Sequence, residues 1–470
     1  MLFYTFKFLF FFGAVWGVVR LLNRHTPTWR NSFLLAASWC FYGAFKGEFL
    51  LWLWYVTLIT YFFGRLIAAV PLTWQRRVTG IAVTLTLLPL GFFKYTKFLC
   101  SALLELPGLS GGTVPAALEN LLLPVGISFF TFQALTYTID LYRRKIPVEK
   151  NFLTLALFVA FFPTVLSGPI EKARELIPQL KKNPPLDLIS LADGAHIFIW
   201  GLFKKLVVAD RLGFYVDFIY GNIGGHSGKS IAFAAICYSI QIYCDFSGYS
   251  DMAVGVGRAL GFELERNFNY PYFAFGIRDF WKRWHISLTS WFTEYLYFAC
   301  GGNRVSRLRW VGNILLVFLV SGLWHGANWT FLIWGGLHGV FYLLEFALTR
   351  GQKPAMKSAF SRLAVWLVTF AAVTFAWIFF RLPQLSAAGE LFKQLLFAWG
   401  RPFSVGPSAF SFVLMLAVSG LVGVVEFKRN FVAEPTAPPL ALRRCFFSVT
   451  LLWLVELLGV SGKQFVYFLF

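Results

Sequence analysis

The sequence predicts an all-α polytopic membrane protein, on two observations. Hydrophobic residues make up 58% of the 470 residues and charged residues only 14%, whereas soluble domains carry about 25% charged residues. Apolar runs also recur along almost the whole chain, and about 20 apolar residues suffice to cross roughly 30 Å of hydrocarbon as a helix. No polar stretch is long enough for a second soluble domain, so we expect one integral membrane domain over residues 1–470.

The apolar segments give the expected helices in chain order. The first has no basic stretch before it and no small-residue cleavage site, so it is expected to be a retained helix. Segments 151–168 and 284–300 are too short to span and are expected to be re-entrant half-helices buried in protein. The expected segments lie near residues 3–19, 31–45, 49–64, 78–93, 121–142, 151–168, 190–209, 230–257, 284–300, 311–327, 329–347, 363–380, 407–426 and 446–460.

The net charge of +20 is explained by membrane topology. Lys and Arg gather in the short connections between apolar runs, as expected for cytoplasmic loops that face anionic lipid headgroups. Arg20, Arg24 and Arg30 predict that the first helix ends in the cytoplasm and that Met1 lies outside. Membrane lipids are therefore expected partners, and nucleic acid is not.

His325 is the first candidate catalytic residue, because it is ionisable and lies within an apolar run. Ionisable groups at membrane depth are expensive and usually face a cavity or a partner. If its helix begins near Asn313 at the cytoplasmic face, His325 lies about 18 Å into the membrane. A neutral imidazole accepts a proton near pH 7, as activation of a hydroxyl or thiol requires. Trp324 and Asn328 are expected to line a narrow tunnel beside it.

His285 is the second candidate catalytic residue. It lies forty residues before His325, which leaves room for a half-helix, a loop and a returning helix, so the two side chains can converge. Lys282 and Arg283 precede it, and we expect them to bind the phosphates of an acyl donor. The alternative for His285 is an interfacial anchor of the half-helix.

Asp245 and Ser247 belong to a polar stretch within an apolar segment and are expected either to line the tunnel or to form structural pairs. His338 is expected to be structural, because the glycines around it favour close helix packing. No HExxH, CxxC or G-x-S-x-G motif occurs. We therefore expect no metal site and no hydrolase-type serine.

Several motifs resemble, in order and spacing, those of the membrane-bound O-acyltransferases, in particular the branch of alginate O-acetyltransferases. The core motif region is 121–348, and a further match is AWIFFR at 376–381. The motifs are LPVGISFFTFQALTYTIDLYRR (123–144), FFPTVLSGPIEKARELIPQL (161–180), DFSGYSDMAVGVGRALGFELERNFNYPY (245–272), FWKRWHISLTSWFTEYLYF (280–298), GGNR (301–304) and SGLWHGANWTFLIWGGLHG (321–339).

The resemblance implies about a dozen transmembrane helices and re-entrant half-helices around a tunnel, in a multi-pass protein of the bacterial inner membrane. It implies that His325 holds the position of the family's deep catalytic histidine and His285 that of the second site residue. The implied reaction moves an acetyl group from a cytoplasmic donor, with acetyl-CoA as a substrate and no bound cofactor. The implied acceptor is an exported polysaccharide or cell-wall glycan, reached through a periplasmic or other extracytoplasmic partner protein.

Three other functions stay open at the level of the sequence. A D-alanyl transfer enzyme for teichoic acid would take its acyl group from a carrier protein. A lipid O-acyltransferase would use long-chain acyl-CoA. A transporter of an anionic substrate would explain a tunnel without chemistry, although the inverted repeats common in transporters are absent from the sequence.

Overall fold

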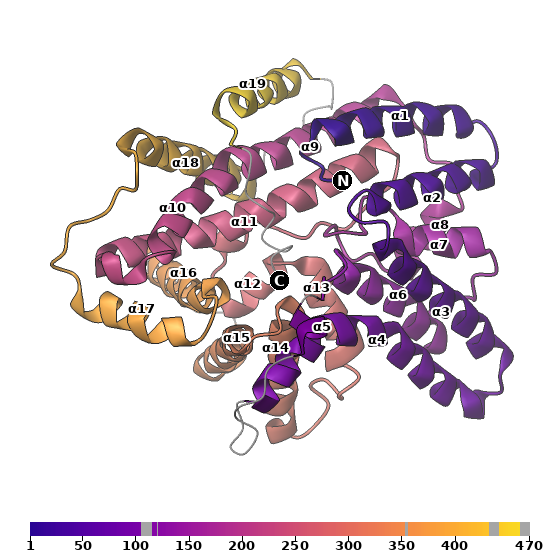
Figure 1. The fold of residues 1–470 in the computed structure, drawn as a ribbon, viewed down its shortest axis with the longest axis horizontal. Coiled ribbons are helices and arrows are strands. Elements are labelled where there is room, and N and C mark those ends of the chain that lie inside the picture. Colours follow the sequence, from indigo (N-terminus) through magenta and orange to yellow (C-terminus); the bar gives the residue numbers. More distant parts are fainter. Residues whose placement is uncertain (105–114, 120, 353–355, 432–440, 461–470) are drawn as a thin grey trace. The chain divides into compact units, whose positions relative to one another are not determined.

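The computed structural model describes residues 1–104, 115–119, 121–352, 356–431 and 441–460, and the regular elements in these residues are helices (Figure 1). The all-α fold class is therefore confirmed. The α-helices are α1 (Phe6–Leu22), α2 (Pro27–Gly43), α3 (Phe49–Ala69), α4 (Leu72–Leu104), α5 (Ala116–Glu119), α6 (Ile127–Tyr142), α7 (Phe152–Ala160), α8 (Ala173–Leu180), α9 (Leu188–Phe203), α10 (Asp210–Tyr220), α11 (Gly228–Ala259), α12 (Ile277–Arg283), α13 (Ile286–Trp291), α14 (Arg307–His325), α15 (Trp329–Leu348), α16 (Ala359–Arg381), α17 (Ser386–Phe397), α18 (Ala409–Phe431) and α19 (Leu442–Leu458).

Seven of the described helices, α3, α4, α11, α14, α15, α16 and α18, are long and apolar enough to cross a membrane by their length and composition. The protein is therefore a multi-pass membrane protein. Short π-helical and 3-10 segments interrupt or join these helices: η1 (Lys204–Ala209), η2 (Ile223–Gly225), η3 (Pro271–Phe273) and η4 (Phe292–Tyr297).

The chain folds into two compact units. Unit 1 comprises Met1–Phe198 and Ser250–Glu265, and unit 2 comprises Ile199–Tyr249 and Arg266–Phe470. The boundaries between the units fall within the residue ranges of α9 and α11. The single membrane domain expected from the sequence stays a prediction.

In unit 1, helices α3, α4 and α6 pack against one another (Figure 1). Gly64 of α3 permits this approach, because a Cβ atom there would lie 2.6 Å from Cε1 of Tyr137 in α6. The Tyr137 hydroxyl accepts a hydrogen bond from the backbone N–H of Glu149 at 2.9 Å. The tyrosine thus links helix packing to the connection between α6 and α7.

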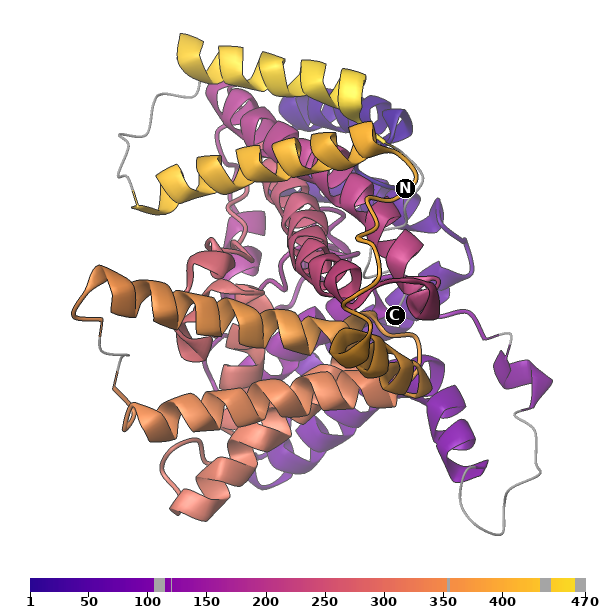
Figure 2. The same cartoon turned by 90° about the vertical axis from the view of Figure 1, so that its left-hand side faces the viewer.

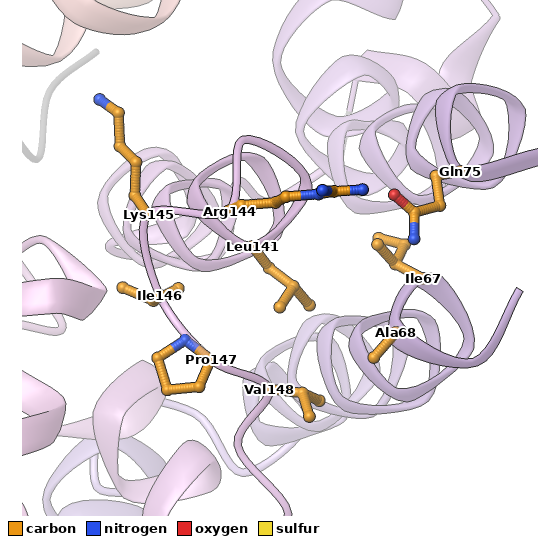
Figure 3. A pocket seen from close by; sticks show the side chains of 9 residues that line it. All are labelled: Ile67, Ala68, Gln75, Leu141, Arg144, Lys145, Ile146, Pro147 and Val148. Carbon is orange, nitrogen blue, oxygen red and sulfur yellow. The ribbon is translucent and has the colours of Figure 1, made fainter. Parts of the chain in front are cut away.

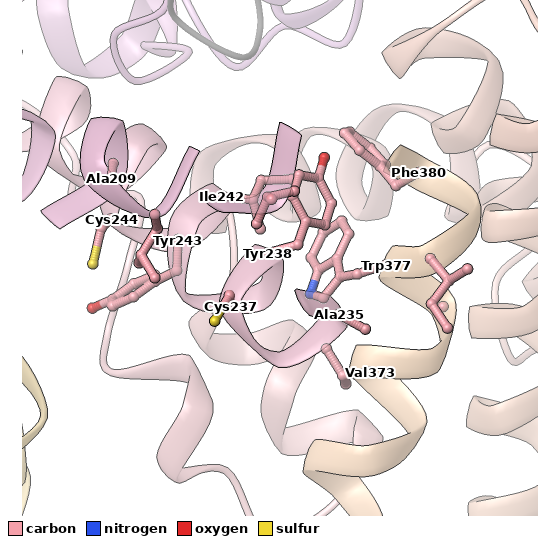
Figure 4. Close-up of a cluster of buried hydrophobic side chains, with 14 of the residues drawn as sticks. Ala209, Ala235, Cys237, Tyr238, Ile242, Tyr243, Cys244, Val373, Trp377 and Phe380 are labelled. Carbon is pink, nitrogen blue, oxygen red and sulfur yellow. The ribbon is translucent and has the colours of Figure 1, made fainter. Parts of the chain in front are cut away.

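In unit 2, α14 packs against α15, and α15 against α16, as three neighbouring helices (Figure 2). The apolar core of the unit includes Trp377, which points from α16 toward Tyr238 of α11 (Figure 4). Both side chains are 1% exposed. His325 is the last residue of α14 and so belongs to this group of helices.

The predicted segments overlap observed helices, with three exceptions, and the short helices α5, α8, α10, α12 and α17 were not predicted. Segment 190–209 is divided into α9 and the π-helix η1. Segment 284–300 is divided into α13 and the π-helix η4, and only residues 152–160 of segment 151–168 are helical. Both remain too short to span alone, as the sequence indicated. Helix α14 begins at Arg307 rather than near Asn313. His325 is therefore the last residue of α14, about 27 Å from its start, instead of about 18 Å.

A buried carboxyl group stabilises one loop connection of unit 1. Glu171 is 1% exposed, and its Oε1 accepts a hydrogen bond from the backbone N–H of Glu265 at 2.8 Å. Burial, together with the nearby Glu265 carboxylate, raises the pKa of Glu171 from 4.5 to about 8. Near neutral pH the folded protein therefore holds a proton that the unfolded chain releases.

We predict that Glu171→Gln makes the protein less sensitive to alkaline pH. Between pH 4.5 and 8 the folded state binds the extra proton, so a rise in pH across this window favours unfolding. The Gln variant carries no such proton, and its melting temperature should fall less between pH 6 and pH 9. Glu48→Gln, at an exposed residue of another segment, is the control and should follow the wild type. Parallel curves for wild type and Glu171→Gln would contradict the prediction.

Candidate active site

His285 lies in a tight turn between α12 and α13 that has an unusual backbone conformation. Its φ of 42° and ψ of 56° are left-handed, a region that non-glycine residues seldom adopt and that costs about 1–3 kcal/mol. Asn267 holds this turn: its carbonyl accepts from the Ile286 N–H at 2.8 Å, and its Oδ1 accepts from the Ser287 hydroxyl at 2.6 Å. Strained residues held in this way cluster at functional sites.

The structure brings the two candidate histidines together, as expected. The ring centroids of His285 and His325 lie 6.4 Å apart with an interplanar angle of 57°. His285 is 0% exposed and His325 is 3% exposed. The rings are close enough for one small group to contact both, which is the arrangement that shared proton transfer requires.

Aromatic side chains surround the histidine pair. Around His325, the centroids of Trp324, Trp334 and Phe380 lie at 4.9, 5.0 and 5.4 Å. Around His285, Phe246 of α11 lies at 4.6 Å and Trp324 at 5.9 Å. These bulky rings exclude water and fix the orientation of both imidazoles. In such an apolar setting, hydrogen bonds to a reacting group are stronger than in water.

Asp245 and Ser247 pair with two buried lysines of the π-helix η1. The Lys205 ammonium lies 2.6 Å from an oxygen of Asp245 and 2.7 Å from one of Asp210. Lys204 donates to the Ser247 hydroxyl at 2.8 Å and lies over the rings of Trp200 and Tyr243. These contacts match the structural pairing that the sequence left open. The tunnel-lining role of Asp245 and Ser247 stays a prediction.

A close helix crossing makes these buried pairs possible. A Cβ atom at Gly248 of α11 would lie 2.7 Å from the carbonyl oxygen of Gly201 and 3.1 Å from the backbone nitrogen of Lys205. Only glycine permits this approach. On the same helix Tyr243 and Phe246 lie three residues apart and hence on one face, where their rings contact Trp284 and His285 at 6.2 and 4.6 Å.

The remaining candidates lie in different environments. Lys282 is exposed, whereas Arg283 donates to Asp279 at 2.9 Å and to Asn430 at 3.0 Å. Asn328 is the N-cap of α15: its Oδ1 accepts from the Thr330 N–H at 3.2 Å, and its Nδ2 donates to the Pro383 carbonyl at 2.9 Å. The donor-binding and tunnel-lining roles of these residues stay predictions.

His338 is held by the aromatic core. Its Nδ1 accepts from the Trp281 indole N–H at 3.3 Å, and its ring lies between Trp281 and Trp334 at 4.9 and 5.0 Å. Trp334 in turn contacts His325. His338 therefore supports the wall of the site, in agreement with the structural role expected from the sequence. No group of three or more possible metal ligands occurs among the described residues.

A family model for the membrane-bound O-acyltransferases matches residues 38–384. The chain belongs to this family. It is therefore an acyltransferase, and membership argues against the transporter function left open above.

Named relatives extend this assignment. The chain is 37% identical over 403 residues to a probable alginate O-acetylase of Pseudomonas aeruginosa, a match that covers 85% of this chain and 75% of the relative. It is 35% identical over 428 residues to a peptidoglycan O-acetyltransferase of Helicobacter pylori, covering 84% and 80%. A teichoic acid D-alanyltransferase of Bacillus subtilis is 29% identical over 238 residues, covering 47% and 58%.

Sequence reasoning did not single out four residues that shape the site of this O-acyltransferase: Phe246, Asn267, Trp334 and Phe380. All four fall within motifs that carry the family resemblance. Their contribution is to pack or to hold a turn, and that role appears only when segments distant in the chain come together.

We predict that Gly335→Ala weakens the α14–α15 contact that supports His325. A methyl group there would collide with the Phe318 carbonyl of α14, so the helices must separate. Loss of most acyl transfer is expected, with a lower melting temperature. At the neighbouring Gly336 the nearest atom to an added Cβ is Leu319 Cδ2 at 3.7 Å, an ordinary contact. Gly336→Ala is therefore the matched control, and equal behaviour of the two variants would refute the packing argument.

We predict that Lys205→Met destabilises this O-acyltransferase strongly. It leaves Asp210 and Asp245 buried without their cation, a change that costs about 3–5 kcal/mol. Denaturant unfolding of the purified protein measures the loss. A triple variant with Asp210→Asn and Asp245→Asn removes the unbalanced charges and should recover much of the stability. Full stability in the single variant would show that the ion pairs contribute little.

Proposed function

We propose that this O-acyltransferase transfers an acetyl group from a cytoplasmic donor to hydroxyl groups of an exported polysaccharide or cell-wall glycan. The observation that carries the proposal is the buried pair His325–His285 in its aromatic enclosure. The named relatives support the acceptor class, since they act on alginate, on peptidoglycan and on teichoic acid.

In the proposed reaction His325 is the general base. Its neutral imidazole takes the proton of the attacking hydroxyl group while the hydroxyl oxygen bonds to the thioester carbonyl carbon. The C–S bond then breaks, and the leaving thiolate takes up a proton. Thioester cleavage supplies the driving force, so no ATP is required. His285, held by Asn267, contacts the same acyl group and orients or stabilises it.

Acetyl-CoA is the proposed donor, as a substrate and not a bound cofactor. The exposed Lys282 is available for its phosphates, whereas Arg283 already pairs with Asp279 and Asn430. We propose the bacterial inner membrane as the location and a separate extracytoplasmic protein as the partner that presents the glycan. A D-alanyl group carried by a protein thioester is the second candidate donor, supported by the relative in Bacillus subtilis.

We predict that His325→Gln abolishes acetyl transfer while the protein still folds. Loss of a general base reduces rates by about 10²–10⁴-fold. The measurement is transfer of label from acetyl-CoA to glycan, in membranes that contain the native partner and acceptor. His338→Gln is the matched control, because Gln retains an acceptor for the Trp281 N–H, and it should keep most activity.

Each outcome of this assay points to a distinct conclusion. Loss of labelling in His325→Gln at normal membrane levels supports the base role. Unchanged labelling would rule it out and direct attention to His285. Absence of labelling in the wild type, followed by activity with a D-alanyl carrier-protein thioester, would replace acetyl-CoA by the second donor.

A further inference from the structure

Unit 1 contains a cavity of about 360 Å³, which lies apart in the sequence from both candidate histidines (Figure 3). Its volume falls in the range of small-ligand sites. The walls come from the C-terminal ends of α3 and α6, the first turn of α4 and the connection after α6. The lining residues are Ile67, Ala68, Gln75, Leu141, Arg144, Lys145, Ile146, Pro147 and Val148.

Arg144 occupies a backbone position at the end of α6 that favours glycine. The N–H of Lys145 bonds to the Asp140 carbonyl at 2.9 Å and that of Arg144 to the Leu141 carbonyl at 3.0 Å. This is the Schellman motif, whose left-handed residue is usually glycine. Arg144 has φ 57°. An arginine here costs stability that a glycine would not.

The Arg144 side chain extends over the cavity toward Gln75, while Lys145 turns away (Figure 3). No hydrogen bond or ion pair engages the Arg144 guanidinium within the described ranges of the chain. Ala68, Pro147 and Val148 contribute exposed or partly exposed apolar side chains to the lining. The cavity therefore combines the guanidinium of Arg144 with apolar side chains (Figure 3).

The flanking residues indicate the depth of this cavity in the membrane. α3 and α4, whose ends line it, are both candidate membrane spans. Leu72 and Trp74 at the start of α4 are 64% and 54% exposed. Exposed tryptophans at the ends of spanning helices lie at the level of the lipid headgroups.

Charge around the cavity is basic. Arg65, Arg76, Arg77 and Lys150 are exposed on the segments that line or border it. Glu149 is the sole acid in residues 65–77 and 143–150, and it is buried, with Lys181 at 2.5 Å. Such a surface attracts an anion at headgroup depth.

We propose that this cavity binds the phosphate group of an anionic membrane lipid. The Arg144 guanidinium contacts two phosphate oxygens, in the bidentate geometry that arginine forms with phosphates. The start of an acyl chain lies along the more exposed apolar lining residues Ala68, Pro147 and Val148.

The test compares lipid binding to the purified full-length chain by native mass spectrometry. Phosphatidylglycerol and phosphatidylcholine with the same acyl chains are the two probes. Arg144→Gly should lower the affinity for phosphatidylglycerol about fivefold, the ratio that corresponds to about 1 kcal/mol for one basic residue near a membrane surface. Affinity for phosphatidylcholine should stay unchanged. Arg144→Gln removes the charge without adding backbone freedom and should show the same loss.

Arg350 provides a matched control. It ends α15 in the same motif, with φ 51° and with Gly351 N–H bonded to the Phe346 carbonyl at 2.8 Å, but it does not line this cavity. Arg350→Gly should leave phosphatidylglycerol binding unchanged. Equal loss in Arg350→Gly would overturn the proposal, as would unchanged binding in Arg144→Gln. Displacement of the lipid by millimolar inorganic phosphate or coenzyme A would assign the site to a soluble phosphate compound instead.

Discussion

The ion pairs of Lys205 with Asp210 and Asp245 hold the middle of α11 against the π-helix η1 at a place without access to water. In such an interior each charge needs a partner close by, so the pairs allow few alternatives to the observed register. Gly248 permits the contact by removing the side chain that would separate the two helices. On α11, directly beside Asp245, Phe246 packs on the ring of His285. The position of a candidate catalytic residue thus depends on these buried charges.

The frame of the site combines two kinds of packing. Glycines bring α14 and α15 into close contact, and the aromatic rings of Trp324, Trp334 and Phe380 then fill the remaining space around His325. Apolar side chains gain little from association inside a bilayer, so close packing has to supply the specificity. Because His325 ends α14, residues of the turn that joins α14 to α15 can also stabilise its position. The chain places Asn328 there, as the cap of α15.

The length of the apolar runs predicted the helices that are long enough to span a membrane, because runs such as 49–64 and 363–380 are nearly uniform in their apolar character. Length could not predict the division of 284–300 into α13 and η4, since a π-helix differs from an α-helix by hydrogen bonds that composition does not record. The convergence of His285 and His325 was inferred from chain length between them. The partners of Asp245 were not predicted, because nothing in the sequence pairs it with one particular lysine, and only the fold joins it to Lys205.

Arg144 and His285 share an unusual backbone conformation. Both have left-handed backbones without being glycine, and both are held by local hydrogen bonds that stabilise the strained residue. The sequence alone shows neither, because Arg and His carry no signal of positive φ. At His285 the strain directs an imidazole toward a second histidine, and at Arg144 it accompanies a guanidinium over a cavity. Arg350 has the same backbone conformation but does not line the cavity, so strain by itself assigns no function. At His285 and Arg144 the inference rests on what each side chain faces, a second imidazole in one case and a cavity in the other (Figure 3).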